Sequence, residues 1–197
     1  DLQPIRSFKL RGAYHKIYKL SDAERKLGIV CASAGNHAQG VALACNKLGI
    51  KGTIFIPVPT PKQKLNQVRM FGGQYIETRL VGDTFDDAYA AAQSFKDKSK
   101  SIFIHPFEDK DVVIGQATLA LELLEQAQDP IDYILVPIGG GGLISGVLHV
   151  FKTLSPYTKV IGIEPEGAPA MYQSLERGKN TELNSIDPFV DGAAVRK

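Results

Sequence analysis

The sequence of 197 residues contains no tryptophan, only two cysteines and no long apolar run. The cysteines, Cys31 and Cys45, stand in apolar surroundings without the spacing of zinc ligands, so we expect two core thiols in a reducing compartment. No segment approaches the roughly 18 uninterrupted apolar residues of a membrane span, and no signal-peptide pattern opens the chain. These absences predict a soluble, cytoplasmic protein.

An excess of charge of one sign is also lacking. The 23 Lys and Arg residues nearly balance the 21 Asp and Glu residues, and the formal net charge is +2. Because no run of basic residues is long enough to track a phosphate backbone, the sequence does not predict a nucleic-acid partner. Hydrophobic residues make up 44% and charged residues 22% of the chain, which is ordinary for a globular domain and excludes a disordered or collagen-like chain.

Short apolar runs alternate with helical patterns along the chain. The runs expected to form strands are 29–32, 53–56, 74–76, 102–104, 133–136 and 160–163. The expected helices are 11–20, 36–48, 61–71, 84–98, 111–127, 143–154 and 168–177. Most strand runs lack in/out alternation, which is typical of a parallel sheet with helices on both faces. The pattern predicts an α/β fold whose ligands bind beyond the carboxyl ends of the strands, with a domain boundary near 105–110.

A loop of four glycines follows one predicted strand and precedes a predicted helix. Gly139, Gly140, Gly141 and Gly142 have no Cβ atoms, so their N–H groups can converge on one anion at the start of the helix, next to Leu143. The loop lacks the Lys-Ser/Thr pair of a Walker A motif and does not fit GxGxxG. The sequence therefore predicts a phosphate site, with a turn that needs glycine only for close packing as the alternative.

Two further segments contain candidate site residues. In the turn after Ala32, the amides and the Ser33 hydroxyl can hold a carboxylate while the Asn36 amide points at a ligand oxygen, although simple helix capping also explains the turn. His37, the next residue, is either a further site residue or a histidine with a purely structural role. Lys9, at the entry to the first helix beside Phe8, is either a solvated charge or an amine of lowered pKa that attacks a carbonyl.

Taken together and in this order, SFKLRGAY, SAGNHAQG and GGGGLISG resemble the pyridoxal-phosphate-dependent threonine dehydratase (threonine deaminase) family. The resemblance covers essentially the whole chain, including DLQP, GDTFDDA, GIEPEGA and FVDGAAV. It implies a tryptophan-synthase-like, fold-type II architecture with parallel sheets flanked by helices, incomplete at both ends. It also implies that 12–106 form a small α/β domain, while 1–11 and 107–197 belong to the large cofactor-binding domain.

The resemblance assigns the site residues as well. It implies that Lys9 carries pyridoxal 5'-phosphate and acts as the catalytic residue, that Phe8 packs against the cofactor ring and that Asn36 binds the ring hydroxyl. The implied phosphate ligands are Gly139, Gly140, Gly141, Gly142 and Leu143. The implied carboxylate ligands are Ser33, Gly35, Asn36 and His37. The implied reaction converts L-threonine to 2-oxobutanoate and ammonia, and L-serine to pyruvate as a lesser activity, in isoleucine biosynthesis or threonine catabolism. The family also implies a homodimer or homotetramer.

The chain departs from the related serine racemases at two positions. Ala34 stands where those enzymes have a second serine, so we expect elimination with little racemisation. Ala170 stands at the second acidic position of their metal site and leaves Glu164 alone, so we expect no metal. Serine racemase or serine dehydratase, a nicotinamide-binding Rossmann domain, and a noncatalytic fragment or binding module remain alternatives.

Overall fold

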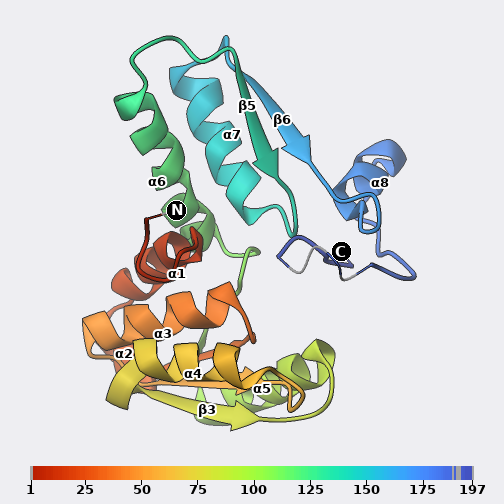
Figure 1. Ribbon diagram of the computed structural model, residues 1–197. Coiled ribbons are helices and arrows are strands. Elements are labelled where there is room, and N and C mark those ends of the chain that lie inside the picture. The colour runs from red at the N-terminus through yellow and green to blue at the C-terminus, as the bar shows by residue number, and fades with distance from the viewer. Residues whose placement is uncertain (1, 188, 190–191, 197) are drawn as a thin grey trace. The chain divides into compact units, whose positions relative to one another are not determined.

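The computed structural model describes residues 2–187, 189 and 192–196. The chain forms two compact units, Asp1–Pro106 and Phe107–Lys197 (Figure 1). Within the described ranges, no helix has both the length and the apolar character that are needed to cross a membrane. The assignment of residues 1–11 to a larger domain stays a prediction.

The first unit is built from helices and parallel strands. Its elements are α1 (Lys9–Tyr18), α2 (Asp22–Leu27), β1 (Ile29–Ala32), α3 (Asn36–Leu48), β2 (Gly52–Ile56), α4 (Lys62–Gly72), a 3-10 turn (Gly73–Tyr75), β3 (Ile76–Leu80), α5 (Phe85–Ser99) and β4 (Ile102–Phe103). The strands form one parallel sheet in the order β3-β2-β1-β4. Successive strands move outward from β1 to β3, and α5 then returns the chain to place β4 on the other side of β1. The carboxyl ends of β1 and β4 are therefore the topological switch point, where open α/β sheets bind ligands.

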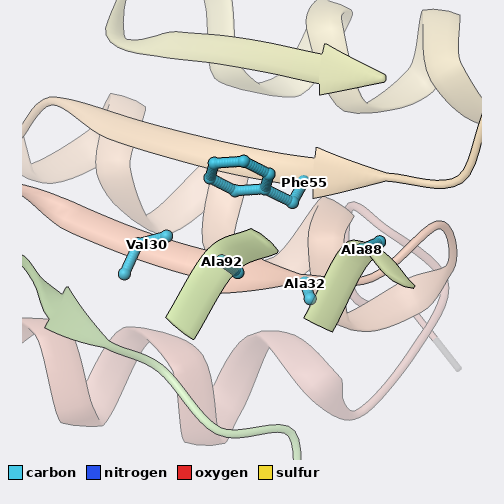
Figure 2. Packing of buried hydrophobic residues seen from close by; sticks show 5 residues of the cluster. All are labelled: Val30, Ala32, Phe55, Ala88 and Ala92. Atoms are coloured by element: carbon cyan, nitrogen blue, oxygen red, sulfur yellow. The ribbon is translucent and has the colours of Figure 1, made fainter. Parts of the chain in front are cut away.

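Apolar packing between the sheet and α5 forms one part of the core. Figure 2 shows Val30 and Ala32 of β1 and Phe55 of β2 against Ala88 and Ala92 of α5. All five side chains are buried. Because successive side chains of a strand point to opposite faces, the other residues of β1 face α3, which covers the second face of the sheet. Both faces are thus covered, as the continuous apolar strand runs predicted.

Among its described residues, the second unit has a two-stranded parallel sheet and three helices. Its elements are α6 (Lys110–Gln126), β5 (Tyr133–Pro137), α7 (Gly142–Leu154), β6 (Lys159–Ile163) and α8 (Ala170–Arg177). Helices α6 and α7 pack closely together beside β5 and β6 (Figure 1). Val136, Val147 and Phe151 lie in the apolar cluster that joins the two helices to the sheet. This packing fixes the turn between β5 and α7, which contains the four glycines.

The sequence expectations fail at two elements. The run 74–76 is not a strand: Gln74 and Tyr75 belong to the 3-10 turn, and β3 runs from Ile76 to Leu80. The strand has few apolar residues to reveal it in the sequence, because in the described sheet β3 is a partly exposed edge strand that pairs with β2. The six-residue helix α2 was not expected either. It depends on a capping box between Ser21 and Glu24 rather than on a buried apolar face. Cys31 and Cys45 are buried free thiols, as expected.

Candidate active site

The Lys9 amine lies at the switch point of the first sheet. Lys9 is the first residue of α1, and its Nζ donates a hydrogen bond of 3.1 Å to the carbonyl oxygen of Pro106, in the segment that follows β4. The same nitrogen lies 5.2 Å from the centroid of the Phe8 ring. An added Cβ on Gly40 of α3 would lie 3.1 Å from the Lys9 carbonyl group, so glycine at this position allows α1 to approach α3.

Burial gives this amine an unusual acidity. Desolvation lowers the pKa of Lys9 from 10.5 to about 8, because the ammonium form loses the hydration that stabilises its charge. About a tenth of the amine is therefore neutral at pH 7, compared with well under a thousandth at the ordinary pKa. A neutral amine can accept a proton or attack a carbonyl, whereas an ammonium group can do neither.

The turn after β1 places an open helix N-terminus at the same end of the sheet. The Ser33 N–H donates to the carbonyl oxygen of Phe55 at 3.1 Å, and the Ser33 hydroxyl accepts the Gly35 N–H at 3.2 Å. Helix α3 then begins at Asn36, with Gly35 as its N-cap, no side-chain cap and no acidic residue in its first turn. Because the first N–H groups of a helix have no partner within it, this end of α3 can bind an anion.

His37 is a structural neighbour of this turn. Its ring is buried, and its Nε2 lies 2.9 Å from the carbonyl oxygen of Ile104, the residue directly after β4. A carbonyl oxygen only accepts hydrogen bonds, so Nε2 carries the proton. Burial, followed by the positive charge of Lys9, lowers the pKa of His37 from 6.5 to about 3. The neutral ring thus connects α3 to the residue after β4 by a hydrogen bond. The side chain is therefore engaged, so the expected role of His37 in carboxylate binding falls to its backbone N–H and stays a prediction.

The glycine loop of the second unit has no room for side chains. An added Cβ on Gly140 would lie 2.4 Å from the Phe107 ring, and one on Gly142 would lie 2.9 Å from Phe107 Cα. Gly141 has a φ of +81° and forms the N-cap of α7, which has no side-chain cap. Leu143 packs its side chain toward the apolar core, so only its backbone N–H is available to a ligand. The loop borders a cavity of about 790 Å³.

The carboxylate of Glu164 is engaged by the backbone. One oxygen accepts the Met171 N–H at 2.8 Å, and the other accepts the Tyr172 N–H at 2.7 Å. In the described part of the chain, no three His, Cys, Asp or Glu side chains are grouped closely enough to hold a metal ion. The expected absence of a metal site stays a prediction.

Sequence reasoning located the turns but missed their tertiary partners. The carbonyl oxygens of Ile104 and Pro106 give no sequence signal, because every residue has such a group. Phe107 fell in the irregular stretch 105–110, and Met171 fell in an ordinary helical pattern. Only the three-dimensional packing brings Phe107 under Gly140 and Met171 close to the glycine loop.

The first unit has a desolvated lysine at the switch point of its sheet, and the second has a glycine loop at an open helix N-terminus. A neutral lysine amine can bind a carbonyl group, and such a loop can bind a phosphate. The chain belongs to the family of pyridoxal-phosphate-dependent enzymes, whose family model matches residues 1–197. This membership places the α/β fold among the fold-type II enzymes and disfavours the nicotinamide-binding alternative.

The curated relatives point to one activity. The chain is 55% identical over 197 residues to "L-threonine dehydratase biosynthetic IlvA" of Halalkalibacterium halodurans, covering 100% of this chain and 48% of that protein. It is 52% identical to the protein of the same name from Bacillus subtilis, of which it covers 47%. The chain therefore spans about half the length of these relatives.

Solved structures agree in fold. The processed form of threonine deaminase isoform 2 from Solanum lycopersicum superposes with a TM-score of 0.94 and 44% identity, over 100% of this chain and 56% of that chain. Maize serine racemase gives a TM-score of 0.91 and 36% identity, over 98% of this chain and 57% of that chain. The fold is thus common to both activities, and the higher identity is to the deaminase.

Proposed function

We propose that the complete protein is a pyridoxal-phosphate-dependent threonine dehydratase of the biosynthetic kind, which converts L-threonine to 2-oxobutanoate and ammonia. The Lys9 amine is the observation that carries the proposal, because burial lowers its pKa to about 8 at the switch point of the sheet. The names of the curated relatives support the substrate and the biosynthetic role. Serine is the lesser substrate of this proposal.

The residues present fit the cofactor. The glycine loop, which a Cβ at Gly140 would fill, would hold the phosphate with its N–H groups, together with the N–H of Leu143. Lys9 would hold the cofactor carbon covalently, with Phe8 beside it and Asn36 as a hydrogen-bond donor. When bound, pyridoxal phosphate supplies an electron sink that acidifies the Cα–H bond of an amino acid.

The chain's own groups then bind the substrate and move its proton. The open N-terminus of α3, with Ser33, Gly35, Asn36 and the His37 N–H, would hold the substrate carboxylate. Lys9 Nζ would accept the Cα proton, because a pKa of about 8 provides the neutral amine. One water leaves with the β-hydroxyl, and one water is consumed in the later hydrolysis at Cα. The net reaction therefore releases one ammonia from each threonine and consumes no water.

Two measurements on the complete protein test this function. Borohydride reduction with bound pyridoxal phosphate, followed by peptide mapping, is expected to place the label on Lys9. Lys9→Ala is expected to lower 2-oxobutanoate formation by about a thousandfold or more, the size of a lost general base. Lys26→Ala, at an exposed lysine of α2, is the matched control and is expected to keep full turnover. Labelling spread over surface lysines, or equal loss in both variants, would refute the proposal.

Two further measurements on the complete protein address racemisation and oligomeric state. Because Ala34 has no proton to give, D-serine formation from L-serine is expected to be a minor fraction of pyruvate formation. Substantial D-serine formation would favour the racemase alternative. The fold that the chain shares with maize serine racemase supports this alternative. Assembly into a homodimer or homotetramer also stays a prediction, which sedimentation of the complete protein measures.

A further inference from the structure

We propose that Glu164 is a positioning residue for the phosphate site: its carboxylate fixes the first turn of α8, and through Met171 it supports Gly141 of the glycine loop. This inference rests on the proposed function, since it concerns the loop that would hold the cofactor phosphate. It is confined to the second unit.

The first step is the capping of α8 from outside the helix. Pro169, the N-cap residue, makes no side-chain cap hydrogen bond, and the first turn contains no acidic residue. Glu164 replaces both, because its two oxygens accept the N–H groups of Met171 and Tyr172 at 2.8 and 2.7 Å. A carboxylate at this end of a helix is stabilised by the partial positive charge of the unpaired N–H groups.

The second step is the contact of α8 with the loop. An added Cβ on Gly141 would lie 3.0 Å from Met171 Cε, so the methyl group of Met171 packs directly on this glycine. Gly141 is the N-cap of α7 and has a φ of +81°, which glycine adopts without strain but is also free to leave, so a side chain packed on it restricts the loop to one conformation. Phe107 supports the neighbouring Gly140 in the same way. The loop thus depends on two side chains, of which Glu164 positions one.

The third step is that Glu164 is anchored to the same strand end as the loop. It directly follows Ile163, the last residue of β6. The carbonyl oxygen of Ile163 accepts the N–H of Ile138 at 2.8 Å, and Ile138 directly precedes Gly139. Glu164 and the glycine loop therefore begin at neighbouring, hydrogen-bonded strand ends. A helix held by Glu164 is thereby held at a fixed position relative to the loop.

A purely structural role is the competing explanation. Ala168 and Ala170 are buried beside Leu183, and this apolar cluster also holds the start of α8. If the cluster alone fixes α8, Glu164 contributes to stability and nothing to the loop. The two explanations differ in one measurable property, which is discrimination between ligands with and without a phosphate group.

The test uses pyridoxal phosphate and pyridoxal as probes of the complete protein. Glu164→Gln keeps the size of the side chain but removes its charge and one acceptor atom. We expect this variant to bind pyridoxal phosphate about fivefold more weakly, the scale of a lost helix cap, and to bind pyridoxal unchanged. Glu166→Gln is the matched control, because Glu166 is exposed and two residues away, and it is expected to bind both ligands like the parent protein.

A second pair of variants tests the route through Met171. Met171→Ala is expected to reproduce the phosphate-specific loss, whereas Met171→Leu, which keeps the volume, is expected to restore most of the affinity. The double variant Glu164→Gln, Met171→Ala is expected to lose less than the product of the two single effects, because both changes act on one contact. Urea unfolding of each variant checks that α8 and the unit remain folded.

Each outcome decides a specific statement. A loss confined to pyridoxal phosphate in both single variants supports the proposal. Equal losses for both ligands, or unchanged binding of both, overturn the positioning role while leaving the proposed function intact. Failure of the parent protein itself to bind pyridoxal phosphate overturns the proposed function and this inference with it.

Discussion

Replacing Lys9 by methionine is expected to stabilise the cofactor-free protein at neutral pH. The Lys9 ammonium is desolvated in the folded state, which lowers its pKa from 10.5 to about 8. At 1.36 kcal/mol per pKa unit, holding the charged amine in the folded state costs about 3 kcal/mol at pH 7. Methionine fills a similar volume without this charge.

The pH dependence separates this effect from other consequences of the substitution. The unfolded chain binds the proton more tightly than the folded chain between pH 8 and 10.5, so the parent protein gains stability relative to Lys9→Met across that window. The charge cost falls to about 1 kcal/mol at pH 10. Loss of the hydrogen bond to the Pro106 carbonyl adds a constant term, because a neutral amine also donates it.

The assay is urea unfolding of the parent protein, Lys9→Met and the exposed-site control Lys26→Met at four pH values from about 7 to 10. We expect the gap between Lys9→Met and the parent protein to narrow steadily as the pH rises, and the gap for Lys26→Met to stay near zero. A gap for Lys9→Met that does not change with pH would refute the desolvation argument, whatever its size.

Two further substitutions test the open helix N-terminus and the glycine loop. Gly35→Asp is expected to stabilise the protein by only about a few tenths of a kcal/mol as a new N-cap of α3, since glycine is itself a tolerated N-cap and nothing lies within 4 Å of the added Cβ. It is expected to raise the KM for threonine strongly, because the new carboxylate would occupy the carboxylate site. Urea unfolding and steady-state kinetics measure the two effects, and an unchanged KM would contradict the assignment. Gly140→Ala is expected to weaken pyridoxal phosphate binding by about tenfold or more, because its Cβ would meet the Phe107 ring at 2.4 Å and displace the loop; binding equal to that of the parent protein in an absorbance titration would contradict this.

The sequence predicted the elements whose signals are local. The apolar run at β1 and the glycine-terminated pattern of α3 were both recognised, because burial and capping act on neighbouring residues. Strand β3 was misplaced because its side chains are polar at a sheet edge, where only the backbone ladder with β2 defines the strand. The rule that ligands bind at the carboxyl ends of strands directed attention to the turns after β1 and β5, where the candidate carboxylate and phosphate ligands lie.

Lys9 shows where sequence reasoning needs a fold. Nothing adjacent to Lys9 in sequence predicts burial, and a lone lysine is ordinarily solvated. Its lowered pKa results from the packing of α1 against α3, which Gly40 permits, and from the position of the segment after β4. These are contacts between residues 31 and 97 positions apart, so only the resemblance to a family could indicate the role of the lysine before the fold was known.

The distribution of helix caps follows the same pattern in each of the two units. Helices α2, α5 and α6 receive side-chain caps from Ser21, Thr84 and Asp109, respectively. The N-termini of α3 and α7 receive none and begin with glycine at the N-cap, although both follow parallel strands at the ends where ligands bind. A helix N-terminus without its own anion can accept a foreign one. Helices α1 and α4 also lack side-chain caps, so the feature that sets α3 and α7 apart is the glycine at the N-cap, which leaves their first N–H groups accessible to a substrate carboxylate and a cofactor phosphate.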